Sequence, residues 1–204
     1  MDFLKERNLW QIYRESRVIS TSWINKSLTL LMLFLAFMNG LSLSTNELYV
    51  ATTTTSSSLF GVLLTTLGFL VAGYTIFCSV LPIDLQKTMM NVIDDETKLS
   101  YLKKFHFLFL RVFFYFVVFS GVLFIINFFQ GSSGLLVKLL VEDIQYFIIN
   151  LIGYCIVFTF TIFLLLELMS FIFNIFESIR AALNWQKIVD DKRMKTEQDT
   201  NIDS

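Results

Sequence analysis

Four long apolar runs decide what this chain can fold into. They cover about residues 27–43, 57–81, 107–129 and 146–176. A helix needs roughly 20 mostly apolar residues to cross the hydrocarbon core of a bilayer, since it rises about 1.5 Å per residue. Of the 204 residues, 55% are hydrophobic and only 16% are charged. The sequence therefore predicts an all-α polytopic membrane protein with four transmembrane helices.

Lys and Arg residues are concentrated on one side of these predicted spans. The N-terminal segment, the loop 82–106 and the C-terminal tail hold fourteen of them, whereas the two other loops hold only Lys138. Short basic segments next to a span stay in the cytoplasm. We therefore expect both termini and the loop 82–106 to be cytoplasmic. The acidic cluster 94–96 in this loop suggests one or two short helices with acidic starts.

The polar segments divide the chain into three parts. Residues 1–26 mix aromatic and apolar side chains with charged ones, which predicts an amphipathic helix on the membrane surface or, alternatively, against a partner. Residues 27–181 form the four-helix transmembrane domain, and residues 182–204 form a polar cytoplasmic tail. On the outer side we expect a short solvated turn over residues 44–56 and a flexible hinge over residues 131–134.

Small residues form a seam along the second span. They recur at steps of three and four, which places them on one side of a helix, as in the contact seam of a left-handed helix pair. In lipid, close backbone approach and hydroxyl hydrogen bonds hold helices together. The pattern predicts packing against another helix, first within the chain, and the alternative is the lining of a narrow polar path. We call these residues the small-residue seam: Ser58, Gly61, Thr65, Gly68, Ala72, Thr75 and Ser79.

Two ionisable residues lie inside predicted spans. Counting along the third and fourth runs places Arg111 and Glu167 at a similar depth, near the inner boundary of the hydrocarbon. Charges at this depth usually face the protein interior or a water-filled cavity, so the sequence predicts an intramembrane ion pair between them. The alternative is that Arg111 extends to the lipid headgroups and Glu167 lies at the interface.

An inner polar seam continues along the same helix through Ser170, Asn174 and Glu177. Three roles fit it: joining several copies around an axis, lining an inner vestibule, or docking a cytoplasmic partner. An ordinary solvent-facing stripe is the alternative.

The sequence carries no pattern typical of an enzyme. His106 is the one histidine, and Cys78 and Cys155 both lie inside predicted spans. Neither a metal-binding spacing of His and Cys nor a glycine-rich phosphate loop is present. We expect no catalytic, cofactor-binding or metal site and, at a net charge of −1, no direct nucleic-acid binding.

In length and architecture, residues 1–193 resemble the KwaA family, the membrane subunits of the bacterial Kiwa anti-phage defence system. The resemblance carries no functional residue over. It implies a homo-oligomer in the bacterial inner membrane that couples events at the envelope to a cytoplasmic partner.

We therefore expect a homo-oligomeric inner-membrane sensor or scaffold of antiviral defence. Its predicted partners are the lipid bilayer, other copies of itself and a cytoplasmic protein. The alternative function is an oligomeric pore or channel that depolarises the membrane when it is triggered.

Overall fold

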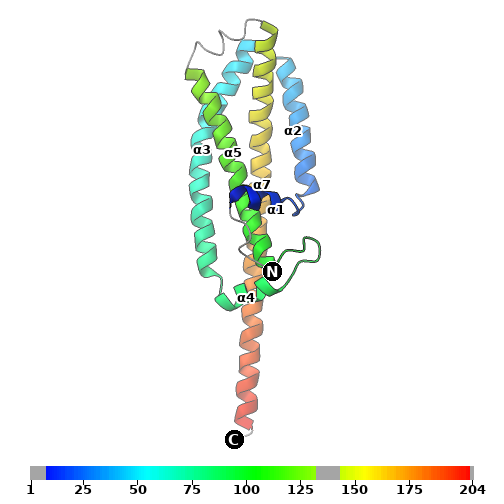
Figure 1. Ribbon diagram of the computed structural model, residues 1–204, viewed down its shortest axis with the longest axis vertical. Coiled ribbons are helices and arrows are strands. Elements are labelled where there is room, and N and C mark those ends of the chain that lie inside the picture. Colours follow the sequence, from blue (N-terminus) through cyan, green and yellow to red (C-terminus); the bar gives the residue numbers. More distant parts are fainter. Residues whose placement is uncertain (1–7, 132–142, 203–204) are drawn as a thin grey trace.

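The computed structural model describes residues 8–131 and 143–202, which are helical apart from short connections. The helices are α1 (Leu9–Ser16), α2 (Trp23–Leu41), α3 (Thr45–Val80), α4 (Ile83–Asn91), α5 (Tyr101–Gly131) and α7 (Asp143–Ile202). They form an elongated bundle in which α7 extends alone beyond the other helices (Figure 1). The residues 132–142, on which most of the expected hinge falls, lie outside the described residues.

Four of these helices are long and apolar enough to cross a membrane. The segments that meet this condition are Trp23–Leu41, Thr45–Val80, Tyr101–Phe129 and Ile144–Val189. Their surfaces carry many exposed large apolar side chains, among them Leu30, Phe69 and Phe124, as is expected for helices that face lipid rather than water. The predicted all-helical fold with four candidate spans is confirmed.

The largest difference from the sequence-based expectation is the start of α3. Residues 44–56 do not form a solvated turn, because a capping box at Ser44 and Glu47 already begins the helix there. The Ser44 hydroxyl accepts a hydrogen bond from the Glu47 N–H, and the Glu47 carboxylate accepts one of 2.8 Å from the Ser44 N–H. Beyond this cap, the Thr53 hydroxyl donates to the Tyr49 carbonyl of its own helix at 2.7 Å, so a polar residue remains compatible with a buried helix.

The other boundaries also move outward. The first span begins at Trp23 rather than residue 27, and the described residues before it, 8–22, contain one short helix, α1. In the loop 82–106, α4 is one of the expected short helices, but the acidic cluster 94–96 lies in a tight turn after it. The expected polar tail 182–204 continues α7 as a helix as far as Ile202.

The main core lies between α3, α5 and α7. Its buried residues repeat at steps of seven on α3 and α7 and at alternating steps of three and four on α5, which is the spacing of left-handed helix packing. These core residues are Leu63 and Leu70 on α3, Val157, Leu164 and Phe171 on α7, and Phe109, Val112, Phe116, Phe119 and Leu123 on α5.

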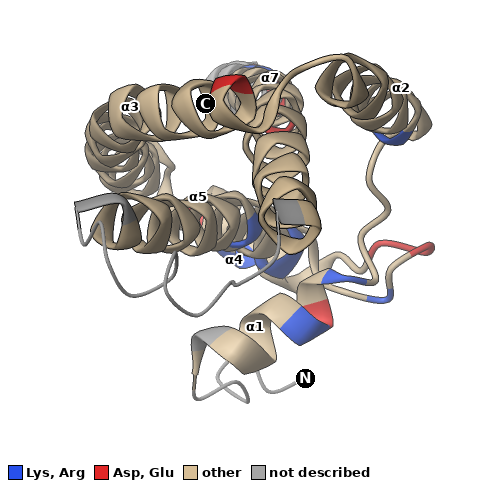
Figure 2. Cartoon of the chain, turned by 90° about the horizontal axis from the view of Figure 1, so that it is seen from above, with Lys and Arg blue, Asp and Glu red and all other residues tan. Residues whose placement is uncertain are grey.

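The helix α2 packs on the other side of α7. Seen from above, α7 lies between α2 and the pair formed by α3 and α5 (Figure 2). Ala36 and Gly40 of α2 are buried in this contact, and the amide of Asn39 donates a 2.7 Å hydrogen bond to the Tyr154 hydroxyl of α7. Small residues four positions apart let two helix backbones approach closely in lipid.

Candidate functional site: a buried polar junction and its pocket

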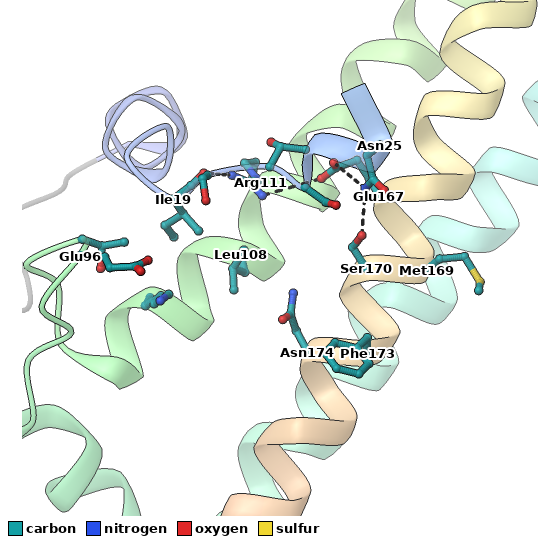
Figure 3. Close-up of a pocket in the computed structure, with 15 residues that line it drawn as sticks. Ile19, Asn25, Glu96, Leu108, Arg111, Glu167, Met169, Ser170, Phe173 and Asn174 are labelled. Carbon is teal, nitrogen blue, oxygen red and sulfur yellow. Dashed lines mark hydrogen bonds and ion pairs between the residues drawn. The ribbon is translucent and has the colours of Figure 1, made fainter. Parts of the chain in front are cut away.

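Four helices meet at a polar junction, which we define as Arg111 of α5, Glu167 and Ser170 of α7, Asn25 of α2, and the main-chain carbonyls of Ser16 and Ile19 at the end of α1. Hydrogen bonds and one ion pair connect all of these groups, and Figure 3 shows those among Ile19, Asn25, Arg111, Glu167 and Ser170. The junction therefore ties the N-terminal helix to three of the four candidate spans.

Arg111 is the centre of the junction. Its side chain is only 6% exposed, and its Nη1 donates a hydrogen bond of 2.7 Å to the Ile19 carbonyl and a longer one of 3.5 Å to the Ser16 carbonyl. Carbonyls at the C-terminal end of a helix lack regular partners and carry the negative end of the helix dipole. Ser16 is the last residue of α1 and Ile19 lies in the connection that follows it, so the end of α1 and this connection together supply carbonyls to a guanidinium that is buried from water.

Glu167 supplies the opposite charge. Its Oε2 lies 3.8 Å from Nη2 of Arg111, and its side chain is 3% exposed, so the structure places the two predicted partners together. The amide of Asn25 donates to the Ser170 hydroxyl at 2.9 Å and reaches Glu167 Oε1 at 3.5 Å. Such additional hydrogen bonds are needed because burying two charges costs several kcal/mol per ion.

Aromatic side chains fix α1 across α5. The ring of Tyr13 stacks on Phe114 with centroids 4.5 Å apart, and it meets Tyr115 edge-on at 6.0 Å. Trp10 contacts the same Phe114 ring at 6.3 Å. Such aromatic pairs each contribute about 0.5–1.5 kcal/mol beyond the area they bury. The aromatic residues of the N-terminal segment thus contact a helix of their own chain.

A pocket of about 590 Å³ lies beside the junction. Its walls come from the connection between α1 and α2, from α5, from α7 and from the loop before α5, and both Arg111 and Glu167 line it. Within the described residues, the Nε of Arg111 is buried and has no hydrogen-bond partner. A buried donor without an acceptor is costly, so this nitrogen marks a place where an acceptor would be stabilised.

The loop before α5 forms another wall of this pocket. The carboxylate of Asp94 accepts hydrogen bonds from the Thr97 hydroxyl at 2.7 Å and the Thr97 N–H at 3.0 Å, and it lies 3.0 Å from Lys104 Nζ. Lys98 closes the turn with a positive φ of 57°, a conformation that a tight turn imposes. The Thr97 hydroxyl, then Lys104 and the Thr97 N–H, lower the pKa of Asp94 to about 2.

The small-residue seam does not pack within this chain. All seven of its residues are exposed, and a Cβ added at Gly61 or Gly68 would have nothing within 4 Å. The expectation of intramolecular packing is therefore wrong. The physical reason is that the core needs volume between α3, α5 and α7, which the large residues Leu63 and Leu70 on the opposite face of α3 supply.

The inner polar seam of α7 is divided between different surroundings. Ser170 belongs to the junction, and Asn174 lines the pocket. Glu177 does not line the pocket and pairs with Arg180 of its own helix at 3.2 Å, where Glu177 is half-buried and Arg180 is exposed. The seam is thus a pocket wall at its upper end and a solvent-facing stripe at its lower end.

The remaining candidate residues serve helix contacts. Nδ1 of His106 lies 2.7 Å from the Tyr74 hydroxyl, so this pair joins α5 to α3. Cys155 is buried between α7 and α2, and Cys78 is half-buried. Among the described residues, no group of three or more His, Cys, Asp or Glu side chains is placed to hold a metal ion.

Sequence reasoning missed three parts of the site. The spacing of Ala36 and Gly40 could have predicted close helix packing. Asn25, a polar residue in the first turn of a span, could have predicted a buried hydrogen bond. The carbonyls of Ser16 and Ile19 left no signal, because every residue carries a carbonyl.

Comparison of the chain with protein-family models, with curated proteins and with solved structures gives no match.

Proposed function

We propose that this chain is a homo-oligomeric membrane sensor or scaffold that acts on a cytoplasmic protein partner. The observation that carries the proposal is the small-residue seam on α3, whose seven residues are all exposed and whose Gly61 and Gly68 have open space beside them. In lipid, a helix face that permits close backbone approach is a contact face for another helix. A second copy supplies that helix.

The concentration of Lys and Arg in the terminal segments and in the loop 82–106 supports an orientation with both termini and α4 on the cytoplasmic side of a bacterial inner membrane. In this orientation α1, with its exposed Trp10, lies at the level of the inner lipid headgroups, where Trp is favoured. The lower part of α7 then extends into the cytoplasm. Its exposed Ile172, Phe176, Ile179 and Leu183 follow one another at steps of four, three and four, a face suited to a partner helix.

The resemblance in architecture to the KwaA family supports an anti-phage role for such a sensor. The cytoplasmic partner is then the component that acts when the envelope is disturbed. Co-purification of the full chain with the proteins encoded beside it tests this part of the proposal.

The oligomer is tested by native mass spectrometry of the full chain in detergent. Gly61→Ile and Gly68→Ile add volume to the seam without contacting the chain's own helices, so we expect them to leave the fold intact and to abolish the oligomer. Gly121→Ile is the matched control, because Gly121 is an exposed α5 glycine that also has nothing within 4 Å. A monomeric parent protein would contradict the proposal.

A pore is the second candidate, and the hydroxyls of the exposed seam favour it. Thr65 and Thr75 each donate to a carbonyl of α3, at 3.0 and 2.9 Å, which leaves their oxygen lone pairs facing outward for a path through an oligomer. Conductance in liposomes that is lost in Thr65→Leu and Thr75→Leu would favour the pore over the scaffold.

A further inference from the structure

We propose that the pocket beside the polar junction binds the zwitterionic phosphoethanolamine headgroup of a membrane phospholipid. This inference goes beyond the proposed function, since it needs neither an oligomer nor a protein partner. It rests on the charges of the pocket, on the unpaired nitrogen of Arg111 and on the exposed apolar side chains Met169 and Phe173 that line the pocket.

The pocket carries both signs of charge. Lys104 and Arg111 line it together with Glu96 and Glu167, and Asp94 lies next to Lys104. Arg111 pairs with Glu167 and Lys104 pairs with Asp94, which leaves Glu96 as the lining charge without an ion-pair partner among the described residues. The pocket therefore gives no net attraction to a simple anion. A ligand that itself carries a phosphate and an ammonium group matches this arrangement, because its ammonium compensates Glu96, whereas an anionic headgroup leaves Glu96 uncompensated.

The acidic and basic groups of the pocket lie at different positions, so each end of such a ligand can bind a different group. Glu96 lies on the opposite side of the pocket from Glu167 and Asn174, and Arg111 lies between them (Figure 3). The buried Nε of Arg111 lacks an acceptor within the described residues, and a phosphate oxygen supplies one as a charge-assisted hydrogen bond. The ammonium then takes its place beside the exposed carboxylate of Glu96.

The pocket also offers an apolar exit for acyl chains. Met169 and Phe173 line it and are exposed on α7 by 69% and 62%. Higher on α7 and α2, Leu33, Phe37, Ile156 and Phe160 line a second pocket, of about 550 Å³, with an entirely apolar surface. One leaflet is about 15 Å deep, or about ten helical residues, which is the separation between Ser170 at the first pocket and Phe160 at the second.

Native mass spectrometry tests the proposal with the delipidated full chain, titrated separately with dioleoylphosphatidylethanolamine, dioleoylphosphatidylglycerol, soluble O-phosphoethanolamine and inorganic phosphate. We expect one phosphatidylethanolamine per chain, bound at least about fivefold more tightly than phosphatidylglycerol. Each substitution that removes a headgroup contact should then weaken binding of phosphatidylethanolamine by about fivefold. This corresponds to less than about 1.4 kcal/mol, the free energy of a tenfold change.

The direction in which one substitution changes the affinity distinguishes a site for a zwitterionic headgroup from a site for an anionic one. Glu96→Gln should weaken binding of phosphatidylethanolamine, because it removes the partner of the ammonium, whereas at an anion site the same substitution would tighten binding. Lys104→Gln should also weaken it. Asp95→Asn is the control, because it changes a neighbouring acid that does not line the pocket.

Three results would overturn the inference. These are equal or tighter binding of phosphatidylglycerol, tighter binding after Glu96→Gln, and unchanged binding in both pocket variants, which would mean that the lipid binds elsewhere on the apolar surface. Binding of soluble O-phosphoethanolamine or inorganic phosphate as tightly as the lipid would overturn the lipid as the source of the headgroup.

Discussion

Gly40 of α2 lies so close to Leu151 of α7 that a Cβ added at Gly40 would stand 2.5 Å from the Leu151 Cδ1. The same added atom would meet Tyr154 and Leu48 at 3.5 and 3.6 Å. Any other residue at this position would therefore force the Leu151 side chain to move within the contact between the first and the last candidate span.

Gly40→Val should accordingly destabilise the bundle. Overpacking of a tight contact costs about 1–3 kcal/mol, and the expected result is a lower midpoint of thermal unfolding in detergent. Gly121→Val is the matched control, since a Cβ there meets nothing within 4 Å. Equal midpoints for the two variants would show that α2 and α7 are farther apart than described here.

Arg111 and Glu167 should behave as a coupled pair. Reversing either charge alone leaves two like charges buried together, so Arg111→Glu and Glu167→Arg should each lower the yield of folded protein strongly; breaking a buried pair costs about 3–5 kcal/mol. The double variant should recover part of this loss. Recovery stays incomplete because a carboxylate at position 111 cannot donate to the Ile19 carbonyl, which Arg111 does at 2.7 Å.

Size-exclusion chromatography of the four proteins measures this coupling. Losses that simply add in the double variant would show that the two charges do not interact. Arg180→Glu, which breaks an exposed pair on α7, serves as the control and should leave the yield nearly unchanged.

The hydrogen bond between Asn39 and Tyr154 should contribute measurably to the contact between α2 and α7. Asn39→Leu and Tyr154→Phe each remove one partner of a 2.7 Å bond. In a double-mutant cycle we expect a coupling free energy of about 0.6–1.7 kcal/mol, the range found for hydrogen bonds between membrane helices. Denaturation of the four proteins in mixed micelles measures it, and a coupling near zero would mean that the two side chains bond elsewhere.

Asp94 should make the loop before α5 sensitive to acid. Its folded-state pKa of about 2 is lower than the ordinary value of 3.8, so the folded state favours the carboxylate. The resulting stabilisation is fully present above pH 4 or so and is lost as the pH falls toward 2. Carbon-13 NMR of the aspartate carboxyls should show this low midpoint.

Thr97→Ala should raise the midpoint of Asp94 toward 3.8, because the Thr97 hydroxyl is the largest cause of the shift. Thr88→Ala is a suitable control, since the Thr88 hydroxyl donates only to the Asp84 carbonyl within α4. A wild-type midpoint near 3.8 would rule out the described contacts of Asp94.

The spans could be predicted from the sequence because the mean hydropathy of a segment depends only on its own residues. No knowledge of the contacts between helices is needed. The proximity of Arg111 and Glu167 could be predicted for a related reason: a fixed rise per residue converts sequence position into depth. The early start of α3 was also readable, since Ser44 and Glu47 have the spacing of a capping box, but the Ser and Thr residues after it suggested a turn.

The orientation of α3 about its axis could not be predicted in the same way. The face with Gly61 and Gly68 and the face with Leu63 and Leu70 both have a helical contact spacing, and the rule that favours small residues in lipid does not say which helix they meet. Likewise, the partner of Arg111 at Ile19 is a main-chain carbonyl, whose position depends on where α1 ends.

Because α7 is a single helix from Asp143 to Ile202, a movement of the helix at the polar junction also moves its far end. Thirty-five residues separate Glu167 from Ile202, or about 52 Å of helix. A tilt of about 5° at Glu167 would displace Ile202 sideways by roughly 4.5 Å, whereas a slide along the axis would arrive unchanged in size. The part of α7 after Glu167 is longer than the part before it, so a small tilt at the polar junction produces a larger displacement at Ile202 than at Asp143.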